Sequence, residues 1–269
     1  MNRAGRDQAS QFWAQSSVLQ LWQGLLHTEA GSLKLLNPSD FDQEVEKIYI
    51  GEVSGKHYFA VISEIPDGSG NNLREIVANL NESLLEVAVT ALALSNWHET
   101  HTHCPRCGAK TKVISNGWVR ECPIDGSHHF PRTDPAIIVA VQDRQGRLCL
   151  GRQASWPENR YSNFAGFVEP GETLEATVAR EVAEESGLVV NDIRYLKSQP
   201  WPFPNSIMLA FEAFTDNPDG AKPDGIEIVD LKWFSRDELV SAISDGSLSI
   251  PPKSTVSGKM IEAWLNGKR

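Results

Sequence analysis

The sequence predicts an α/β fold in three parts, the largest of which contains a mixed sheet. From residue 134 onward, short strand-like runs and helical segments are interspersed along the chain. Cysteine and histidine residues concentrate within residues 99–132. Residues 1–98 combine a hairpin signal with one long apolar helix. We therefore expect domains at residues 1–98, 99–132 and 133–269.

The N-terminal region is predicted to contain a β-hairpin and a helix. Lys47–Val53 and His57–Ile62 are strand-like, and a short Ser-Gly-Lys turn joins them. Leu84–Trp97 is rich in alanine and leucine and is preceded by the capping residues Asn81 and Ser83. These residues carry no recognisable chemistry, so we interpret the region as a scaffold or a dimer surface.

The C-terminal region is predicted to alternate between strands and helices. The expected strands are Ala136–Val141, Arg147–Gly151, Ser162–Val168, Ile193–Leu196, Ser206–Phe214 and Val229–Phe234. The expected helices are Thr173–Ser186, Arg236–Ile243 and Thr255–Asn266. Thr173 is a typical cap at the start of the first helix, and Gly187 follows its end.

Composition limits the function classes. The 269 residues include 25 Lys and Arg against 35 Asp and Glu, giving a net charge of −10, which argues against a general nucleic-acid binder. An acidic enzyme acting on a phosphorylated substrate needs divalent metal to offset the repulsion. We expect no membrane span and no secretory signal, because no apolar run is long enough.

The four cysteines favour metal binding over disulfide formation. Cys104 and Cys107 form a C-P-R-C knuckle, with Cys122 close behind. Cys149 lies in an alternating strand-like run and is expected to pack in the core. This usage suits the reducing cytoplasm, where we expect the protein to be located.

The first C-terminal helix has an apolar stripe that becomes acidic. At about 100° per residue, the stripe of Leu174 and Val178 continues into Glu181 and Glu185, with Glu184 at its edge. Carboxylates crowded on a buried face repel one another unless a cation holds them. A solvated acidic face is the alternative, but the continuity favours an oxygen cage for Mg²⁺ or Mn²⁺.

One basic residue on this helix has two interpretations. Arg180 lies on the side opposite Val182 and could brace a loop carboxylate such as Glu172. The alternative is an ordinary surface arginine.

Residues 166–188 resemble a complete Nudix box. They read G-F-V-E-P-G-E-T-L-E-A-T-V-A-R-E-V-A-E-E-S-G-L, with every fixed position of that pattern present. The resemblance implies a Nudix α/β/α sandwich and the hydrolysis of a nucleoside diphosphate linked to another group.

A second resemblance narrows the branch of the superfamily. The array S-Q-P-W-P-F-P-N-S at residues 198–206 is similar to the one that marks the NADH pyrophosphatases. A rigid proline-rich connector is the alternative. The domain order also resembles that branch, in which an N-terminal domain and a zinc ribbon precede the Nudix domain.

The resemblance implies which residues hold metal. Glu181, Glu184 and Glu185 match the carboxylates of the box, and one of them can double as the base. The backbone carbonyl of Ala165 matches a position that completes the coordination. Glu227 matches a downstream acidic residue at the metal site, with a solvated strand-edge glutamate as its alternative.

The resemblance also implies a substrate site. Phe130 matches an aromatic residue that can stack on the substrate, Phe167 in the box could do likewise, and Ser257 matches a late substrate contact. Gln199 and Trp201–Phe203 would shape the pocket. The whole array is included in the predicted site: Ser198, Gln199, Pro200, Trp201, Pro202, Phe203, Pro204, Asn205 and Ser206.

The zinc ribbon departs from the pattern of the branch, which has a second C-x-x-C pair. Here the second pair reads Cys122-Pro-Ile-Asp125. Asp125 can complete a zinc site with Cys104, Cys107 and Cys122, His128 can replace it, or zinc can have been lost. We expect a structural zinc ion with Asp125 as its fourth ligand.

Three functions remain in view. The first is metal-dependent cleavage of NADH or NAD⁺ to nicotinamide mononucleotide and AMP. The second is removal of the NAD cap from RNA 5′ ends by the same site. The third is a nucleotide-sensing regulator with a Nudix fold, which predicts a damaged box and is disfavoured because this box is whole. The resemblance also implies a homodimer.

Overall fold

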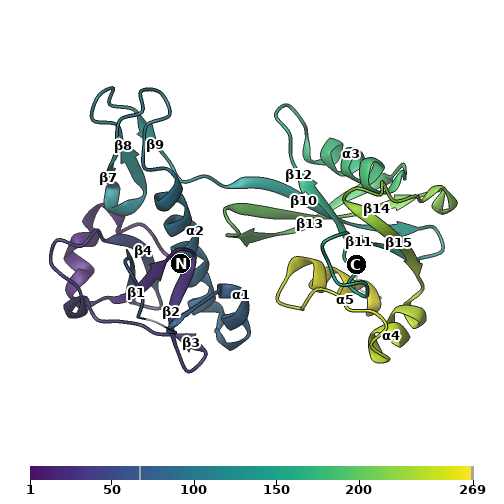
Figure 1. The fold of residues 1–269 in the computed structure, drawn as a ribbon, viewed down its shortest axis with the longest axis horizontal. Coiled ribbons are helices and arrows are strands. Elements are labelled where there is room, and N and C mark those ends of the chain that lie inside the picture. The colour runs from purple at the N-terminus through teal and green to yellow at the C-terminus, as the bar shows by residue number, and fades with distance from the viewer. Residues whose placement is uncertain (67, 268–269) are drawn as a thin grey trace. The chain divides into compact units, whose positions relative to one another are not determined.

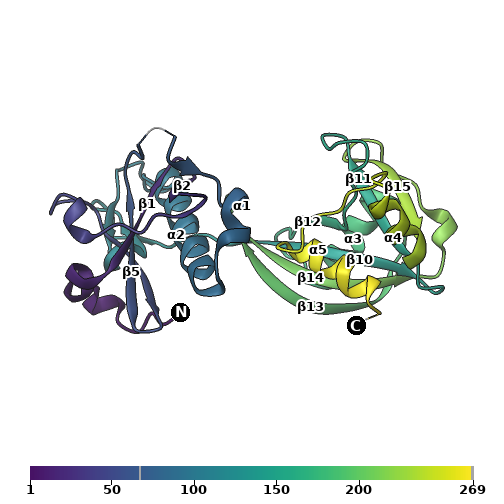
Figure 2. The same cartoon turned by 90° about the horizontal axis from the view of Figure 1, so that it is seen from below.

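The computed structural model describes residues 1–66 and 68–267 (Figures 1 and 2). The chain divides into two compact units. The first comprises Met1–Thr133 together with Trp201–Asn205, and the second comprises Asp134–Pro200 together with the chain from Ser206 onward. Of the predicted domains, Asp67 and residues 268–269 lie outside the described part of the chain.

The first unit contains a mixed sheet covered by a long helix. The strands are β1 (Ser17–Trp22), β2 (Leu25–Glu29), β3 (Ser32–Leu33), β4 (Ile48–Val53), β5 (Lys56–Ile62) and β6 (Gly70–Asn71). Their order is β3-β2-β1-β5-β4, with β6 paired to β2. The antiparallel β4–β5 pair confirms the predicted hairpin. The parallel β1–β5 pair was not predicted, because the two strands lie far apart along the chain and no sequence period links them.

Helix α2 (Glu82–Thr100) packs its apolar residues into this unit's core. The side chain of Asn81 caps it by accepting a 2.9 Å hydrogen bond from the N–H of Leu84. Val87, Ala88 and Ala91 are fully buried against the sheet. The short helix α1 (Leu73–Ile76) precedes α2 along the chain, and 3₁₀ turns occupy Arg6–Gln15, Pro38–Asp40, Val77–Asn79 and Ser115–Gly117.

A small antiparallel sheet follows α2 and carries the cysteine knuckles. Its strands are β7 (Lys112–Ile114), β8 (Val119–Glu121) and β9 (His128–His129), in that order. The sheet offers too few apolar side chains for a core of its own, which is typical of modules held by a metal.

The second unit has a six-stranded mixed sheet. Its strands are β10 (Asp134–Asp143), β11 (Leu148–Gln153), β12 (Phe164–Phe167), β13 (Asn191–Trp201), β14 (Ser206–Thr215) and β15 (Ile228–Phe234). The order is β13-β14-β10-β11-β15, and β12 pairs with β10. The β10–β14 pair is parallel, whereas β10–β11, β10–β12 and β11–β15 are antiparallel.

The central strand β10 faces two cores because it is apolar on both sides. Ile137 and Val139 pack with helix α3 (Leu174–Ser186). Ile138 and Ala140 pack with helices α4 (Arg236–Ser244) and α5 (Val256–Leu265). Figure 1 shows α3 on one face of the sheet and α4 and α5 on the other. This arrangement confirms the predicted α/β/α sandwich with a mixed sheet.

Two further predictions about this unit are confirmed. Cys149 is fully buried in the core beneath α3. Thr173 caps α3, and Gly187 ends it with a φ of 67°, a left-handed conformation that glycine adopts without strain.

No helix among residues 1–66 and 68–267 is long and apolar enough to span a membrane.

Candidate active site and metal centre

Helix α3 directs one glutamate into the interior on its packed face. Val178 and Val182 are fully buried, and Glu185 on the same face is only 4% exposed. The predicted continuation of the apolar stripe into acidic residues is therefore confirmed at Glu185. The side chain of Glu181 is also mostly covered, whereas 60% of the Glu184 side chain is exposed.

Glu185 is a buried carboxyl group without full hydrogen bonding. Burial, and to a smaller extent the negative charges of Glu181, Glu227 and Asp224, raise its pKa to about 8, against the opposing effect of a backbone hydrogen bond from Ala165. Within the described residues, its Oε2 atom has no hydrogen-bond partner. A buried acceptor oxygen that experiences the negative charge of other carboxylates suits a bound divalent cation, which would supply the missing partner.

Arg180 organises three carboxylates of the same region. Its Nε and Nη2 atoms donate to the two oxygens of Glu172 over 2.7 and 2.9 Å. Its Nη1 atom donates to Glu181 over 2.8 Å and to Glu184 over 2.9 Å. The predicted brace on Glu172 is thus confirmed. The guanidinium is the largest of the influences that lower the pKa of Glu172 to about 2, and hydrogen bonds from the N–H of Glu169 and the hydroxyl of Thr177 add to it.

The carboxylate of Glu181 lies against strand β12. A Cβ at Gly166 would lie 1.9 Å from Cδ of Glu181, so only glycine fits beneath it. Burial raises the pKa of Glu181, while Arg180 opposes that shift. The adjoining Ala165 lies opposite Ile138 of β10, which fixes the backbone where a metal-binding carbonyl is predicted.

A loop before β15 adds two more carboxylates. Glu227 is exposed and lies at the end of a turn held by Asp224, whose oxygens accept from the N–H groups of Glu227 (3.1 Å) and Ile228 (2.8 Å). Both carboxylates influence Glu185 electrostatically. The sequence analysis named Glu227 but not Asp224, although the Asp-Gly pair that forms this turn was a usable signal.

The array at residues 198–206 is divided between the two units. Ser198, Gln199 and Pro200 are the last residues of the second unit's share of β13, and Ser206 begins β14. Gln199 donates to the carbonyl of Ser254 over 2.9 Å and accepts from the N–H of Val256 over 2.6 Å. These bonds fix the segment that leads into α5.

Ser257 is placed in the first turn of α5 and is buried. Its hydroxyl lies 2.9 Å from that of Ser162 and accepts from Nδ2 of Asn163 over 3.0 Å. These bonds tie the start of α5 to the segment just before β12.

The two predicted stacking residues are both exposed, as stacking requires. Phe130 belongs to the first unit and is 62% exposed, with its ring 6.5 Å from that of His128. Phe167 ends β12 in the second unit and is 59% exposed, and its carbonyl accepts from Nη2 of Arg180 over 3.0 Å. Single exposed apolar side chains are common on protein surfaces, so this exposure leaves both rings accessible to a base without itself assigning them a ligand.

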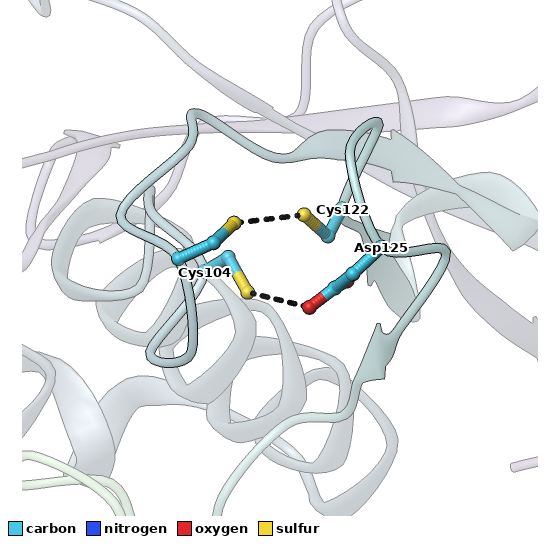
Figure 3. Close-up of side chains that lie close together, drawn as sticks. Cys104, Cys122 and Asp125 are labelled. Carbon is cyan, nitrogen blue, oxygen red and sulfur yellow. Dashed lines mark hydrogen bonds between the residues drawn. The ribbon is translucent and has the colours of Figure 1, made fainter.

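A second cluster lies in the small three-stranded sheet. Ligand atoms of Cys104, Cys107, Cys122 and Asp125 all lie within 4.8 Å of one another. In Figure 3, the labelled side chains of Cys104, Cys122 and Asp125 converge on one point. Turns closed by bonds from Gly108 to Cys104 and from Gly126 to Cys122 hold the two knuckles in this position.

Asp125 is oriented as a ligand would be. Its Oδ1 atom accepts from the N–H and the hydroxyl of Ser127, over 2.9 and 2.6 Å, which leaves Oδ2 facing Cys104 Sγ at 3.8 Å. His128 instead contacts Glu121 over 3.3 Å. The structure thus brings Asp125 to the three cysteines, and three thiols with one carboxylate are a suitable donor set for zinc.

Comparisons with known proteins agree with both clusters. The NUDIX domain model matches residues 132–252, and the model of the NADH pyrophosphatase zinc ribbon domain matches residues 99–130. The "NAD-capped RNA hydrolase NudC" of Mycobacterium bovis is 39% identical over 235 residues, covering 81% of this chain and 75% of the relative. This chain belongs to the NudC family of Nudix hydrolases.

Two other relatives extend the similarity. NudC of Mycobacterium tuberculosis shows the same 39% identity and the same coverage of both chains. The human "NAD-capped RNA hydrolase NUDT12" is 36% identical over 198 residues, covering 69% of this chain and 43% of the human protein. Family membership implies a divalent metal ion at the Nudix box, and the zinc-ribbon match coincides with the cysteine cluster.

Proposed function

We propose that this NudC-family protein hydrolyses the pyrophosphate bond of NADH and NAD⁺, giving nicotinamide mononucleotide in the corresponding redox form and AMP. The observation that carries the proposal is the buried carboxyl group of Glu185, with an unpartnered oxygen among the carboxylates of Glu181, Glu227 and Asp224. The intact box around it supports a hydrolase rather than a nucleotide sensor.

The carboxylates of α3 are proposed to hold Mg²⁺ or Mn²⁺. Glu181, Glu184 and Glu185, the carbonyl of Ala165 and the carboxylate of Glu227 would supply oxygen ligands. A bound divalent ion neutralises charge on pyrophosphate oxygens and lowers the pKa of attacking water. Arg180 holds Glu181 and Glu184 in place until they bind metal, and one carboxylate of the set accepts the proton of the water.

The substrate site is proposed to use aromatic and array residues. The exposed rings of Phe130 and Phe167 suit stacking on the bases of a dinucleotide. The other residues proposed to bind substrate are those of the array, 198–206, together with Glu227 and Ser257. Gln199 supports this assignment because it ties the array directly to the segment just before Ser257.

A second substrate is favoured by the relatives. Those from Mycobacterium and from human are named as hydrolases of NAD-capped RNA, and a cap presents the same pyrophosphate as free NAD. We propose NAD-capped RNA as a further substrate of the same site.

The remaining proposals concern metal, assembly and location. We propose that Cys104, Cys107, Cys122 and Asp125 hold a structural zinc ion. We further propose that the protein is a homodimer in the cytoplasm. Free, unpaired cysteines and the similarity to bacterial NudC proteins support this location.

The decisive experiment is a cleavage assay on the purified protein. NADH is incubated with and without Mg²⁺ or Mn²⁺, and the products are separated by chromatography. We expect metal-dependent formation of reduced nicotinamide mononucleotide and AMP, lost in Glu185→Gln and retained in Glu175→Gln, an exposed glutamate of the same helix. Binding of NADH without cleavage by either metal form would contradict the proposal and favour the sensor.

The same assay extends to RNA. Transcripts of one sequence are compared at equal concentration, one carrying an NAD cap and the other a 5′ triphosphate. Release of nicotinamide mononucleotide from the first, with no change in the second, is the expected result. Cleavage of NADH alone would restrict the function to free dinucleotides.

A further inference from the structure

The centre of the array is built into the N-terminal unit. Trp201–Asn205 belong to the first compact unit, and Phe203 packs against the apolar core that α2 forms with the sheet. Residues 1–98 therefore have a role beyond forming their own folded domain. They contact the part of the chain on which the substrate site is proposed to depend.

The prolines of the array create a need for outside hydrogen-bond donors. Pro200, Pro202 and Pro204 have no N–H, so the segment cannot build a regular backbone ladder. Its internal backbone bond from Phe203 to the carbonyl of Trp201 spans 2.8 Å. The carbonyls of the second and third prolines need donors from elsewhere.

Asn96 on α2 supplies those donors. Its Nδ2 atom donates to the carbonyl of Pro202 over 3.1 Å and to that of Pro204 over 2.8 Å. One amide group thus fixes the backbone on both sides of Phe203. An amide NH₂ is suited to this task because its two hydrogens can serve two acceptors at once.

Arg74 on α1 fixes the two aromatic rings. Its guanidinium carbon lies 4.1 Å from the centroid of the Phe203 ring and 5.2 Å from that of Trp201. The two rings meet edge to face with centroids 5.0 Å apart. A planar cation on two rings restrains their orientation as well as their position.

We propose that Arg74 and Asn96 are positioning residues that hold Trp201 and Phe203 in the conformation needed to recognise the nucleoside part of a dinucleotide. This inference rests on the proposed function. It assigns to the N-terminal unit a role in substrate specificity, exercised through the array rather than by contact with the reacting phosphates.

The test separates substrate recognition from catalysis. Asn96→Asp removes the donors and sets a carboxylate against two carbonyls, and Arg74→Ala removes the cation. We expect KM for NADH to rise about tenfold in each variant, because Asn96→Asp loses two neutral hydrogen bonds and Arg74→Ala loses a cation–π contact of similar strength, with kcat within about twofold of wild type. The preference for NADH over ADP-ribose, which shares the pyrophosphate, should fall in parallel.

Conservative and matched variants complete the design. Arg74→Lys keeps the positive charge, so its KM should lie between those of wild type and Arg74→Ala. Asn79→Asp disturbs a similar side-chain bond, to the carbonyl of Gly31 in the same unit, and Lys56→Ala removes a cation from the ring of Tyr58. Both controls should leave KM and the substrate preference unchanged.

A second measurement is independent of activity. Hydrogen exchange of the peptide that spans residues 199–206 should become faster in Asn96→Asp and Arg74→Ala, and not in the two controls. Unchanged exchange and unchanged KM in an active protein would overturn the inference. A wild-type protein that does not cleave NADH would overturn the proposed function, while faster exchange would still support the positioning of the array.

Discussion

The carboxylate of Glu181 occupies the space above Gly166 in which any other residue would place its Cβ. A Cβ there would lie 2.0 Å from Oε1 and 2.3 Å from Oε2 of Glu181, well inside contact distance. Arg180 holds the same carboxylate from the other side with a 2.8 Å hydrogen bond. The glycine at the start of the box therefore serves the geometry of a carboxylate fifteen positions later, rather than a turn.

Gly166→Ala should lower activity sharply because it displaces Glu181. A shift of about 1 Å in a metal-binding carboxylate is expected to lower kcat about 100-fold. The rate of metal-dependent NADH cleavage measures the effect. Gly246→Ala is the control: its φ of 77° makes alanine strained there, but a Cβ would meet nothing. It should cost about 1 kcal/mol of stability and leave kcat unchanged.

Glu185→Gln should make the protein insensitive to divalent metal. In wild type, Mg²⁺ or Mn²⁺ should raise the unfolding temperature, because the ion binds the folded state and supplies the missing partner of Oε2. The glutamine side chain carries no charge and binds the ion weakly, so the rise should disappear. Differential scanning fluorimetry with and without each metal makes this comparison. An equal rise in both proteins would remove Glu185 from the metal site.

The raised pKa of Glu185 also predicts a pH dependence in buffer without Mg²⁺ or Mn²⁺. The folded protein binds this proton up to about pH 8, whereas the unfolded chain releases it near pH 4.5. The folded state is therefore favoured at low pH, and the group's contribution to the free energy of unfolding falls as pH rises between these values. Glu185→Gln should lose that slope and be more stable than wild type near pH 8.

The sequence was sufficient for the parts of the site that lie on one helix. The periodicity of Leu174 and Val178 predicted that Glu185 would be buried, because a helix turns by a fixed angle per residue. The ion pair between Arg180 and Glu172 could likewise be predicted from the sequence, since the two residues lie close along the chain. Local geometry of this kind follows from residue spacing alone.

Contacts between residues far apart in the sequence could not be predicted from residue spacing. Asp224 reaches the carboxylates of α3 through a turn before β15, and no helical or strand period links them. Asn96 and Arg74 contact the array across more than a hundred residues of sequence, and their own surroundings give no sign of it. Such contacts depend on tertiary packing, which periodicity does not encode.

The zinc-binding assignment predicts different outcomes at neighbouring residues. Cys107→Ser and Asp125→Ala should lower zinc content and thermal stability, because each removes a ligand. Asp125→Cys should retain zinc. His128→Ala should retain it too, since His128 contacts Glu121 and not the cluster. Metal analysis by mass spectrometry decides among them, and loss of zinc in His128→Ala would transfer the fourth position to that histidine.

Ser127 offers a finer test of the same site. Its hydroxyl and N–H fix one oxygen of Asp125, which directs the other toward Cys104. Ser127→Ala should weaken zinc binding by about tenfold, the usual effect of removing a group that orients a ligand. Competition with a chelator gives the affinity. Unchanged affinity would mean that the backbone bond alone orients the aspartate.

His98 links α2 to the zinc-ribbon sheet and should make the protein sensitive to acid. Its Nδ1 atom accepts from Arg120 of β8 and its Nε2 atom donates to the carbonyl of Gly117, each over 2.8 Å. Only the neutral ring can make both bonds, and burial lowers its pKa from 6.5 to about 4. Between these two pH values, His98 is protonated in the unfolded chain but not in the folded protein. The free energy of unfolding therefore falls as pH drops from 6.5 towards 4.

The expected loss between pH 7 and pH 5 is about 2 kcal/mol of unfolding free energy from this residue. Denaturant unfolding at the two pH values measures it. His98→Gln should reduce the loss by that amount, because an amide can accept from Arg120 and donate to Gly117 without titrating. His103→Gln, a change at an exposed histidine of the same module, should leave the loss as in wild type. If all three proteins lose the same stability, another group is responsible for the acid sensitivity, and the hydrogen bonds of His98 survive its protonation.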